Sequence, residues 1–147
     1  MPVSHVLKMS ALDDLASLKA SLRAEGLPHA DLDEPGREFF QFQIGEQWVG
    51  YVGVEGSTAD RLLRSFIVSP SSRGEGIGSQ ALALLEALLV SRGVRTLHLL
   101  TTTAAPFFEY HGFEQCSRAE APSVVQDSLE FRSLCPANAS YMAKRIA

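Results

Sequence analysis

The middle of the chain carries the pattern that most constrains the fold: a strand, a glycine-rich loop, a helix and a second strand, in that order. Leu62–Val68 is rich in branched and aromatic residues and is followed by Pro70. Gln80–Arg92 repeats leucine and alanine at helical spacing, and Gly93 ends it. Val94–Leu100 is again mainly apolar. This order predicts a βαβ unit, whose two strands are parallel where they pair, and therefore an α/β protein.

The segments on either side add further strands and helices. Two segments rich in aromatic and branched residues, Glu38–Ile44 and Gln47–Glu55, are joined by Gly45-Glu46 and predict an antiparallel hairpin. The remaining patterns predict a strand over residues 3–9, a helix opened by Ser10 and stopped by Gly26, a short helix Ala104–His111, a strand Phe113–Ser117, one or two helical turns in Pro122–Ser128 and an edge strand Ser140–Ile146.

Length and hydrophobic content set the size of the fold. The chain has 147 residues, 46% of them hydrophobic, which is enough for one domain with a buried core and too little for two. We therefore expect one domain over residues 1–147, of the α/β (α+β) class, with a central mixed sheet of six to seven strands and three to four flanking helices. The edge strand leaves a homodimer open, although Lys144 and Arg145 could protect that edge.

Charge and cysteine content exclude several classes of function. Lys and Arg number 13 against 17 Asp and Glu, and the net charge of −4 disfavours binding of nucleic acid through phosphate contacts. The longest apolar stretches are far shorter than the roughly 20 residues of a membrane span, and the N-terminus lacks the features of a secretory signal. The two cysteines predict neither a disulfide framework nor a zinc site. We expect a cytoplasmic protein without a metal, nucleic-acid or membrane partner.

The glycine-rich loop has the chemistry of an anion site. It has the pattern Arg73-x-x-Gly76-x-Gly78 between a strand and the start of a helix. At such a place, backbone N–H groups and the positive end of the helix dipole point to the same spot. No Lys-Ser/Thr pair follows the glycines, which excludes a P-loop, and the third glycine of a dinucleotide fingerprint is missing. Taken alone, the loop leaves a plain glycine-rich turn before a helix as the alternative.

Two longer motifs resemble a known family. Arg64–Gly78, with the sequence RSFIVSPSSRGEGIG, is similar to the acetyl-CoA signature of the GNAT N-acetyltransferases, in which a strand ending in Val-x-Pro precedes [Q/R]-x-x-G-x-[G/A]. Ala104–Phe113 (AAPFFEYHGF) resembles the A-x-x-x-[Y/F]-x-x-x-G-F helix and strand of that family. The resemblance covers essentially the whole chain and implies the GNAT fold. Shorter segments, including Leu99–Ala104 and Glu130–Pro136, resemble the small GNAT branch associated with bacterial arsenic-resistance gene clusters.

The resemblance implies acetyl-CoA as the co-substrate and assigns residues to it. The backbone of Phe66, Ile67 and Val68 would run alongside the pantetheine arm, in a gap where the two parallel strands splay apart. Phe108 lies where many relatives carry the tyrosine that protonates the departing thiolate, and Tyr110 is turned away from that position on a helix. The pyrophosphate would be held by the loop, namely by Arg73, Gly74, Glu75, Gly76, Ile77, Gly78 and Ser79.

Five residues are candidates for acceptor binding and proton transfer. Glu55, at a strand end, is a candidate base, with a solvated strand-end charge as the alternative. Arg64 could bind a substrate carboxylate bidentately or form a salt bridge with a neighbouring acid. Thr101 and Cys135 are candidates to replace the missing tyrosine acid, and Thr102 is a candidate for substrate binding. Cys135 could also contact a soft atom such as arsenic, or be a small buried hydrophobe.

These features favour an enzyme that transfers the acetyl group of acetyl-CoA to the amine of a small molecule by direct attack in a ternary complex. The expected acceptor is amino-acid-like, with an organoarsenical among the options. Two other functions stay open. One is a non-catalytic acyl-CoA-binding regulatory module, because the tyrosine acid is missing. The other is a peptide N-acetyltransferase, because the acidic segment Asp31–Glu38 could attract basic peptides.

Overall fold

A computed structural model describes residues 6–27, 29–74, 76–133 and 139–147. Over these residues the chain forms one seven-stranded mixed sheet, five α-helices and two 3₁₀ turns. The strands are β1 (Leu7–Ala11), β2 (Arg37–Ile44), β3 (Gln47–Glu55), β4 (Asp60–Val68), β5 (Thr96–Thr101), β6 (Glu114–Gln115) and β7 (Ser140–Arg145). The helices are α1 (Ala16–Ala24), α2 (Ile77–Ser91), α3 (Ala105–Tyr110), α4 (Ser123–Gln126) and α5 (Leu129–Ser133), and the 3₁₀ turns are η1 (Pro70–Ser72) and η2 (Arg118–Glu120).

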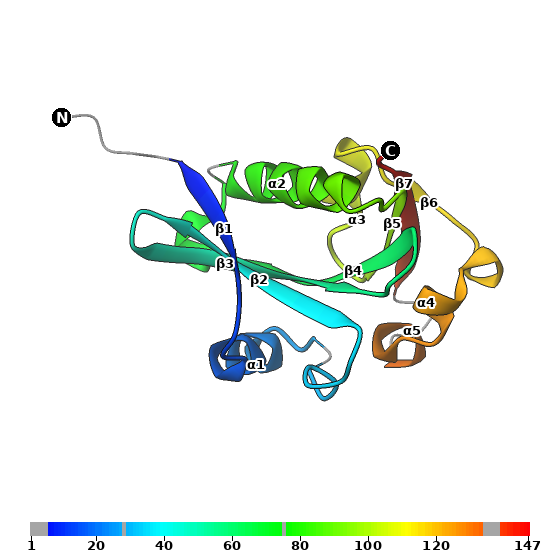
Figure 1. Cartoon of the computed structure of the whole chain (residues 1–147), viewed down its shortest axis with the longest axis horizontal. Helices are drawn as coiled ribbons and strands as arrows, with labels where there is room; N and C mark the ends of the chain where they lie inside the picture. The colour runs from blue at the N-terminus through cyan, green and yellow to red at the C-terminus, as the bar shows by residue number, and fades with distance from the viewer. Residues whose placement is uncertain (1–5, 28, 75, 134–138) are drawn as a thin grey trace.

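The helices cover both faces of the sheet. In Figure 1, α2 and α3 lie above the sheet, and α1, α4 and α5 lie below it. The strand order is β1-β2-β3-β4-β5-β7-β6. The predicted α/β class and a sheet of six to seven strands are confirmed. The prediction of three to four helices is one too low for the described residues, because the connection from β6 to β7 folds into both α4 and α5.

The central βαβ unit predicted from the sequence is confirmed. β4 and β5 are parallel neighbours in the sheet, and α2 connects them. Their ladder is short and ends at the pair Leu62 and His98. Beyond that pair β4 continues to Val68 and β5 continues to Thr101. The two strands therefore diverge near the middle of the sheet.

A bulge in β4 bends this strand at the point of divergence. β4 takes three steps from Arg64 to Ile67, whereas β3 takes two from Gly53 to Tyr51, so the register between the two strands shifts. Ser65 lies in the bulge with a φ of 57°, a left-handed value that is uncommon for residues other than glycine. An extra residue in one strand bends it and increases its twist. The bulge therefore directs the end of β4 away from β5.

Two predictions, one of a helix start and one of an edge strand, are wrong. The sequence predicts that Ser10 opens a helix, but Ser10 lies in β1 and pairs with Gln41, because β1 completes its ladder with β2 before α1 begins at Ala16. Ser140–Ile146 is predicted as an edge strand. In the structure β7 pairs with β5 on one side and with β6 on the other, because the chain returns to the sheet after α3. A homodimer through that edge therefore loses its basis.

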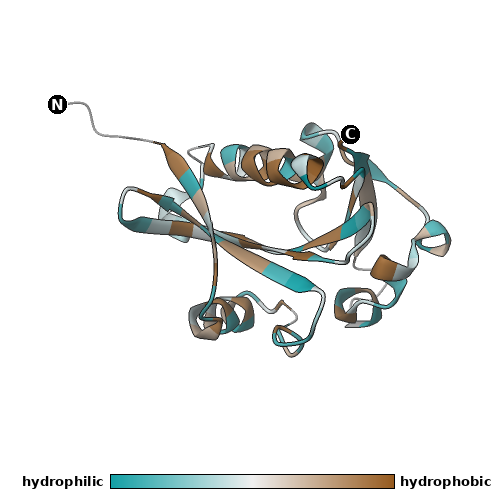
Figure 2. Ribbon diagram, viewed as in Figure 1, coloured by the Kyte–Doolittle hydropathy of each residue, from teal (hydrophilic) through white to brown (hydrophobic). Residues whose placement is uncertain are grey.

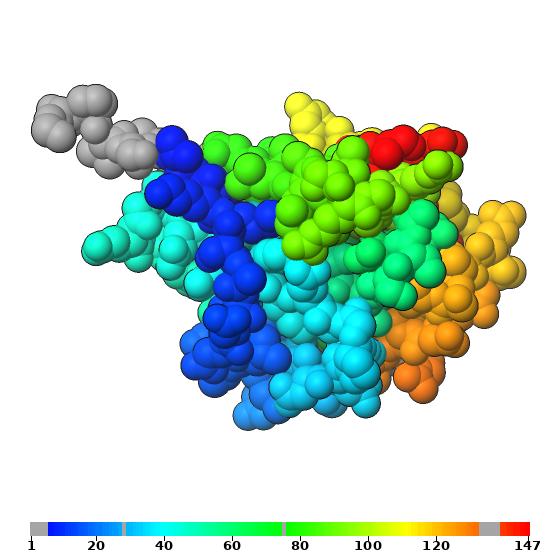
Figure 3. All heavy atoms as spheres, in the orientation of Figure 1, coloured from blue at the N-terminus to red at the C-terminus, as the bar shows by residue number. Residues whose placement is uncertain are grey.

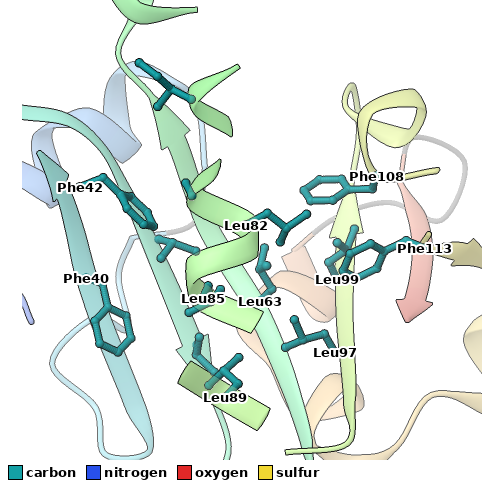
Figure 4. Close-up of a cluster of buried hydrophobic side chains, with 14 of the residues drawn as sticks. Phe40, Phe42, Leu63, Leu82, Leu85, Leu89, Leu97, Leu99, Phe108 and Phe113 are labelled. Carbon is teal, nitrogen blue, oxygen red and sulfur yellow. The ribbon is translucent and has the colours of Figure 1, made fainter. Parts of the chain in front are cut away.

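The main core lies between the sheet and α2. Leu82, Leu85 and Leu89 of α2 point toward Leu63 of β4 and Leu97 of β5, as Figure 4 shows, and all five side chains are buried. Figure 2 shows that most of α2 is apolar, in contrast to the mixed colouring of α1. This core fixes α2 across the two strands that it connects.

The opposite face of the sheet has two smaller apolar clusters. Leu18 and Leu22 of α1 pack with Phe39 of β2, and Val125 of α4 packs with Leu62 of β4. In Figure 3 the segment that joins α1 to β2 lies between α1, at the lower left, and the α4–α5 pair, at the lower right. Charged residues, among them Arg64 and Asp31, are also buried in this protein.

We expect that replacing Gly50 by alanine destabilises the fold. Gly50 of β3 lies so close to β4 that a Cβ atom would overlap the backbone carbonyl oxygen of Ile67. Because a backbone atom cannot move aside without shifting β4, the free energy of unfolding should fall by about 1–3 kcal/mol. Denaturant unfolding measures this, with Gln47→Ala on the exposed start of the same strand as the control. Equal stability of the two variants would contradict the close approach of β3 and β4.

Candidate active site

The divergence of β4 and β5 opens a cavity of about 670 Å³ between them. Residues 63–68 of β4 form one wall, and residues 99–104, from the end of β5 and the loop after it, form the other. The lining is completed by residues 25–27 after α1, Arg73, Gly78, Phe107, Phe108 and Glu130. The predicted splaying of the two strands is thus confirmed. Ligands of open α/β sheets bind in such crevices at the carboxyl ends of the strands, so this cavity is the candidate active site.

The glycines of the loop shape the rim of this cavity. Gly74 and Gly76 have φ values of 84° and 76°, which glycine adopts without steric cost. Gly76 is the N-cap residue of α2, and among the described residues no side chain caps the helix there. The first N–H groups of a helix have no acceptor within the helix. Together with the helix dipole, they give this rim the properties of an anion site.

Arg73 bridges two elements at the same rim. Its Nε donates to the Val68 carbonyl oxygen at 3.0 Å, and its Nη2 donates to Glu25 Oε1, also at 3.0 Å. The two side chains of this ion pair are 52% and 42% exposed. Arg73 therefore ties the end of β4 to the end of α1, and an anion bound at α2 would compete with Glu25 for its guanidinium.

His111 is predicted from the sequence to lie near the last carbonyls of a helix, with a role as base as the alternative; in the structure it ends α3 and its side chain reaches the first turn of α2. Its Nε2 lies 2.9 Å from the hydroxyl oxygen of Ser79, and its ring packs on Phe107 with 4.6 Å between centroids. The only sequence signal was a histidine before Gly112 at a helix end, which is typical of a residue near the last carbonyls of a helix. The hydrogen bond instead ties the end of α3 to the first turn of α2.

Aromatic side chains form one side of the cavity. The Phe66 ring lies 6.1 Å from that of Phe107 and 6.2 Å from that of Phe108, measured between centroids. Phe108 is buried, and it lines the cavity at the position where the motif has tyrosine in many relatives. Tyr110 is 85% exposed, so its hydroxyl is directed away from the cavity, as predicted from helix geometry. This wall of the cavity therefore offers an apolar surface in place of a phenol.

The threonines after β5 line the cavity, but two other predicted residues cannot be placed in it. Thr101 and Thr102 are part of the lining, and the Thr101 hydroxyl oxygen accepts a hydrogen bond from the Ala104 backbone N–H at 3.0 Å. Glu75 and Cys135 lie outside the described residues. The roles predicted for those two residues therefore stay predictions.

Arg64 is held by carboxylates inside the protein. Its side chain is fully buried, and its Nη2 donates to Asp31 Oδ1 at 2.8 Å. Its Nη1 donates to Asp31 Oδ2 and to Glu55 Oε1, and its Nε donates to Ser65 Oγ at 3.2 Å. Of the two predicted roles, the salt bridge with neighbouring acids is the one found. Binding of a substrate carboxylate by Arg64 would require displacing these contacts.

Two arginines lower the pKa of the buried carboxyl group of Asp31. Burial by itself raises the pKa of Asp31, but hydrogen bonds and charge from Arg64 and Arg37 outweigh it and hold the pKa below its usual value. The Arg37 Nε donates to Asp31 Oδ2 at 2.9 Å. Asp31 is therefore a buried ionised partner of two arginines, and it is not part of an exposed acidic surface for basic peptides.

Glu55 is not in the cavity between β4 and β5. It lines a separate cavity of about 380 Å³ together with Arg37, Asp60 and Asp127, among others. Glu55 is buried, and its carboxylate binds the Arg64 guanidinium. A carboxylate held in this way is poorly placed to act as a base in the main cavity, and it is not the solvated strand-end charge that was the predicted alternative.

Glu130 of α5 is a buried acidic residue of the cavity to which the sequence prediction assigned no role. It lines the cavity, is 4% exposed, and its Oε1 lies 3.9 Å from Arg64 Nε. Burial raises the pKa of Glu130 to about 8, with a lowering effect of Arg64 and smaller raising effects of Glu55 and Asp31. The local pattern did not predict a role for Glu130, because its place in the cavity depends on how α5 packs under the sheet.

The described residues contain no group of three or more His, Cys, Asp or Glu side chains that could hold a metal ion. In the same part of the chain, no helix has both the length and the apolar character needed to cross a membrane.

Comparison with protein families gives one match. The model of the family described as acetyltransferase (GNAT) domain matches residues 35–115, which is more than half of the chain. The matched region includes β4, the glycine loop, α2, β5 and α3.

Solved structures share the fold over nearly the whole chain. N-acetylglutamate synthase from Neisseria gonorrhoeae, complexed with coenzyme A and N-acetyl-glutamate, has a TM-score of 0.77 at 19% identity, over 97% of this chain and 35% of that longer chain. A GNAT-family acetyltransferase from Staphylococcus aureus Mu50 has a TM-score of 0.74 at 14% identity, over 97% of this chain and 100% of that one. The ribosomal-protein-S18-alanine N-acetyltransferase from Escherichia coli has a TM-score of 0.68 at 20% identity, over 97% and 95%. Because these sequence identities are low, the similarity establishes that the fold is shared and nothing further.

We expect Arg64→Met to destabilise the protein strongly at neutral pH. The substitution leaves Asp31 and Glu55 buried without their central cation, and breaking such a pair costs about 3–5 kcal/mol. The folded-state pKa of Asp31 is lowered, so its contribution to stability is present above its unfolded pKa and is lost as the pH falls through the folded value. The difference between wild type and variant should therefore shrink on acidification. Unfolding at several pH values measures this, with Arg61→Met on the same strand as the control; a difference independent of pH would contradict the charge cluster.

Proposed function

Because the chain belongs to the acetyltransferase (GNAT) domain family, we propose that it transfers the acetyl group of acetyl-CoA to the amine of a small molecule. The observation that carries this proposal is the cavity between the diverging strands β4 and β5, which meets the start of α2 at Gly78. This arrangement offers an apolar channel that ends at an anion site. Such a combination suits a thioester carried on a long arm with phosphates at its other end.

The residues around the loop fit the phosphate end of acetyl-CoA. We assign the pyrophosphate to the backbone N–H groups of Gly74, Gly76, Ile77, Gly78 and Ser79, with Glu75 as the remaining member of the loop. Two of these glycines have left-handed φ values, and at Gly78 a Cβ atom would crowd the Phe107 ring at 3.3 Å. Side chains at these positions would push a phosphate away from the helix dipole. When the phosphate binds, the Arg73 guanidinium would leave the Glu25 carboxylate and pair with the phosphate.

The backbone of β4 fits the pantetheine arm. Phe66, Ile67 and Val68 lie beyond the last β4–β5 pair and line the cavity, so their edge of β4 can accept an added strand-like ligand. Acetyl-CoA supplies the activated acetyl group as a thioester. A backbone N–H near Val68 would polarise its carbonyl, and Phe108 would pack against the arm. Thr101 would take the place of the tyrosine and protonate the departing thiolate.

The acceptor is the part of the proposal that the fold does not fix. The Neisseria gonorrhoeae enzyme is named for N-acetylglutamate synthesis, and the Escherichia coli enzyme for acetylation of an alanine of ribosomal protein S18. The same fold therefore serves small and protein acceptors. We favour a small amine because Asp31, in the acidic segment expected to attract basic peptides, is buried against arginines. The resemblance to the arsenic-resistance branch adds amino-acid-like organoarsenicals to the acceptors to be tested, with Cys135 as their proposed contact.

The first test is initial-rate release of free thiol from acetyl-CoA with a panel of amines. The panel contains amino acids, an amino-acid-like organoarsenical, ethylamine, polyamines and short peptides. We expect thiol release with at least one small amine and none with peptides. Release with peptides alone would favour a peptide N-acetyltransferase. Binding of acetyl-CoA without release for any amine would favour the non-catalytic acyl-CoA-binding module.

A second test separates the anion site from general effects of glycine substitution. Gly76 and Gly93 flank the two ends of α2, both have left-handed φ values of 76° and 86°, and both have open space for a Cβ atom. Alanine at either position should therefore cost a similar stability, about 1 kcal/mol. Only Gly76→Ala should weaken acetyl-CoA binding, by about tenfold, because only Gly76 lies at the positive end of the helix. Isothermal titration measures both affinities, and an equal loss in both variants would contradict the proposed pyrophosphate site.

A further inference from the structure

The Glu130 carboxylate lines the cavity, and the surrounding protein groups neutralise its charge only weakly. Its side chain is 6% exposed, and no hydrogen bond to it is found within the described part of the chain. The Arg64 Nε lies 3.9 Å away, but its N–H is donated to Ser65. A buried ionised carboxylate is costly unless it is hydrogen-bonded or paired. The position therefore suits a ligand that arrives with a positive charge and N–H donors.

The backbone around Glu130 is firmly anchored. The buried Ser128 hydroxyl donates to the Val125 carbonyl oxygen at 2.6 Å and accepts from the Phe131 backbone N–H at 3.1 Å. Arg118 lies over the Phe131 ring, 4.3 Å from its centroid, and donates to the Phe131 carbonyl oxygen at 2.9 Å. These contacts fix the backbone before and after Glu130. Its carboxylate is thus presented to the cavity by a fixed element.

Among the described residues, the ionised form of Glu130 has no cation of its own. Three carboxylates are buried together, those of Asp31, Glu55 and Glu130, and two arginines contact them, Arg64 and Arg37. Arg37 and Arg64 both reach Asp31 and Glu55, so these four groups balance one another. Glu130 is the carboxylate on the cavity side of this cluster. A positively charged group that enters the cavity would complete the balance.

We propose that Glu130 binds the ammonium group of the acetyl acceptor and removes its proton, so that the acceptor is a compound with a primary ammonium group. This inference rests on the proposed N-acetyltransferase function. One N–H proton passes from the ammonium to the Glu130 carboxylate and then to water. The nitrogen lone pair forms the bond to the acetyl carbon as the carbon–sulfur bond breaks. A second proton from that nitrogen goes to the departing sulfur, which leaves as the free thiol, so one proton is released in total.

The electrostatic setting suits a base that works near neutral pH. Burial raises the pKa of Glu130 to about 8, while Arg64 on β4 lowers it, and Glu55 on β3 and Asp31 before β2 raise it. A general base is most effective when its pKa is close to the working pH. Because the ionised form is the active one, the rate should rise with pH through this range and then level off.

The test compares wild type with Glu130→Gln, using two small amines and the best acceptor of the panel. Ethylamine is an ammonium ion at pH 7 and needs a base, whereas aminoacetonitrile is already neutral at that pH. We expect kcat/KM of Glu130→Gln at pH 7 to fall about 100-fold for ethylamine, and by less than about threefold for aminoacetonitrile, because only the former must lose a proton before attack. The levelling of the pH profile near pH 8 should disappear in the variant.

Three controls separate a catalytic role from a structural one. Glutamine has the shape of a protonated glutamate, so Glu130→Gln should keep the wild-type melting temperature and acetyl-CoA affinity. Glu130→Asp retains the carboxylate and should recover part of the activity with ethylamine. Glu120→Gln changes an exposed glutamate of the same connection and should leave all rates unchanged.

The outcomes distinguish this inference from the function on which it rests. No thiol release by wild type with any amine would contradict the N-acetyltransferase function itself. Release by wild type with equal losses for both probe amines, or with an unchanged pH profile in Glu130→Gln, would contradict the role of Glu130 alone. A variant with altered melting temperature or acetyl-CoA affinity, and no recovery in Glu130→Asp, would assign Glu130 a structural role.

Discussion

The short pairing of β4 with β5 is the constraint on which the rest of the structure depends. The two strands share a parallel ladder that ends at Leu62 and His98, although both continue beyond it. Unpaired backbone groups inside a sheet are unfavourable unless a ligand or water satisfies them. The bulge at Ser65 maintains the divergence, and the α2 core holds the far ends of both strands in place. The cavity, the anion site at α2 and the aromatic wall all follow from this gap.

The buried charge cluster couples this gap to the opposite face of the sheet. Arg64 immediately precedes the bulge residue Ser65, and its guanidinium joins Asp31, from the segment before β2, to Glu55 on β3. The cluster thereby fixes β4 at the point where it turns away from β5. Because Glu130 approaches the same guanidinium from α5, the packing that shapes the cavity also sets the electrostatic environment of its acidic residue.

Much of the fold and part of the candidate site could be predicted from the sequence, because their signals are local. The hairpin at Gly45-Glu46, the helix closed by Gly93 and the βαβ unit all follow from periodicity and from glycine positions, and the structure confirms them. The prediction for Ser10 is wrong because a capping signal and a strand ladder competed for the same residue, and the ladder with β2 was stronger. The edge position predicted for β7 is wrong because β6, which lies within the predicted strand Phe113–Ser117, pairs with β7, and a local pattern does not show which strands pair.

The sequence by itself determined the order of the elements, the glycine loop at the start of α2 and the family-like motifs, because each of these depends on residues close together along the chain. Only the tertiary structure decided which charged groups act together. Arg64 and Asp31 are 33 residues apart, Ser79 and His111 are 32 apart, and Glu130 reaches the cavity from a short helix after β6. Charge pairing and burial depend on distances in space, and a one-dimensional pattern carries no information about the partner that folding brings to a buried side chain.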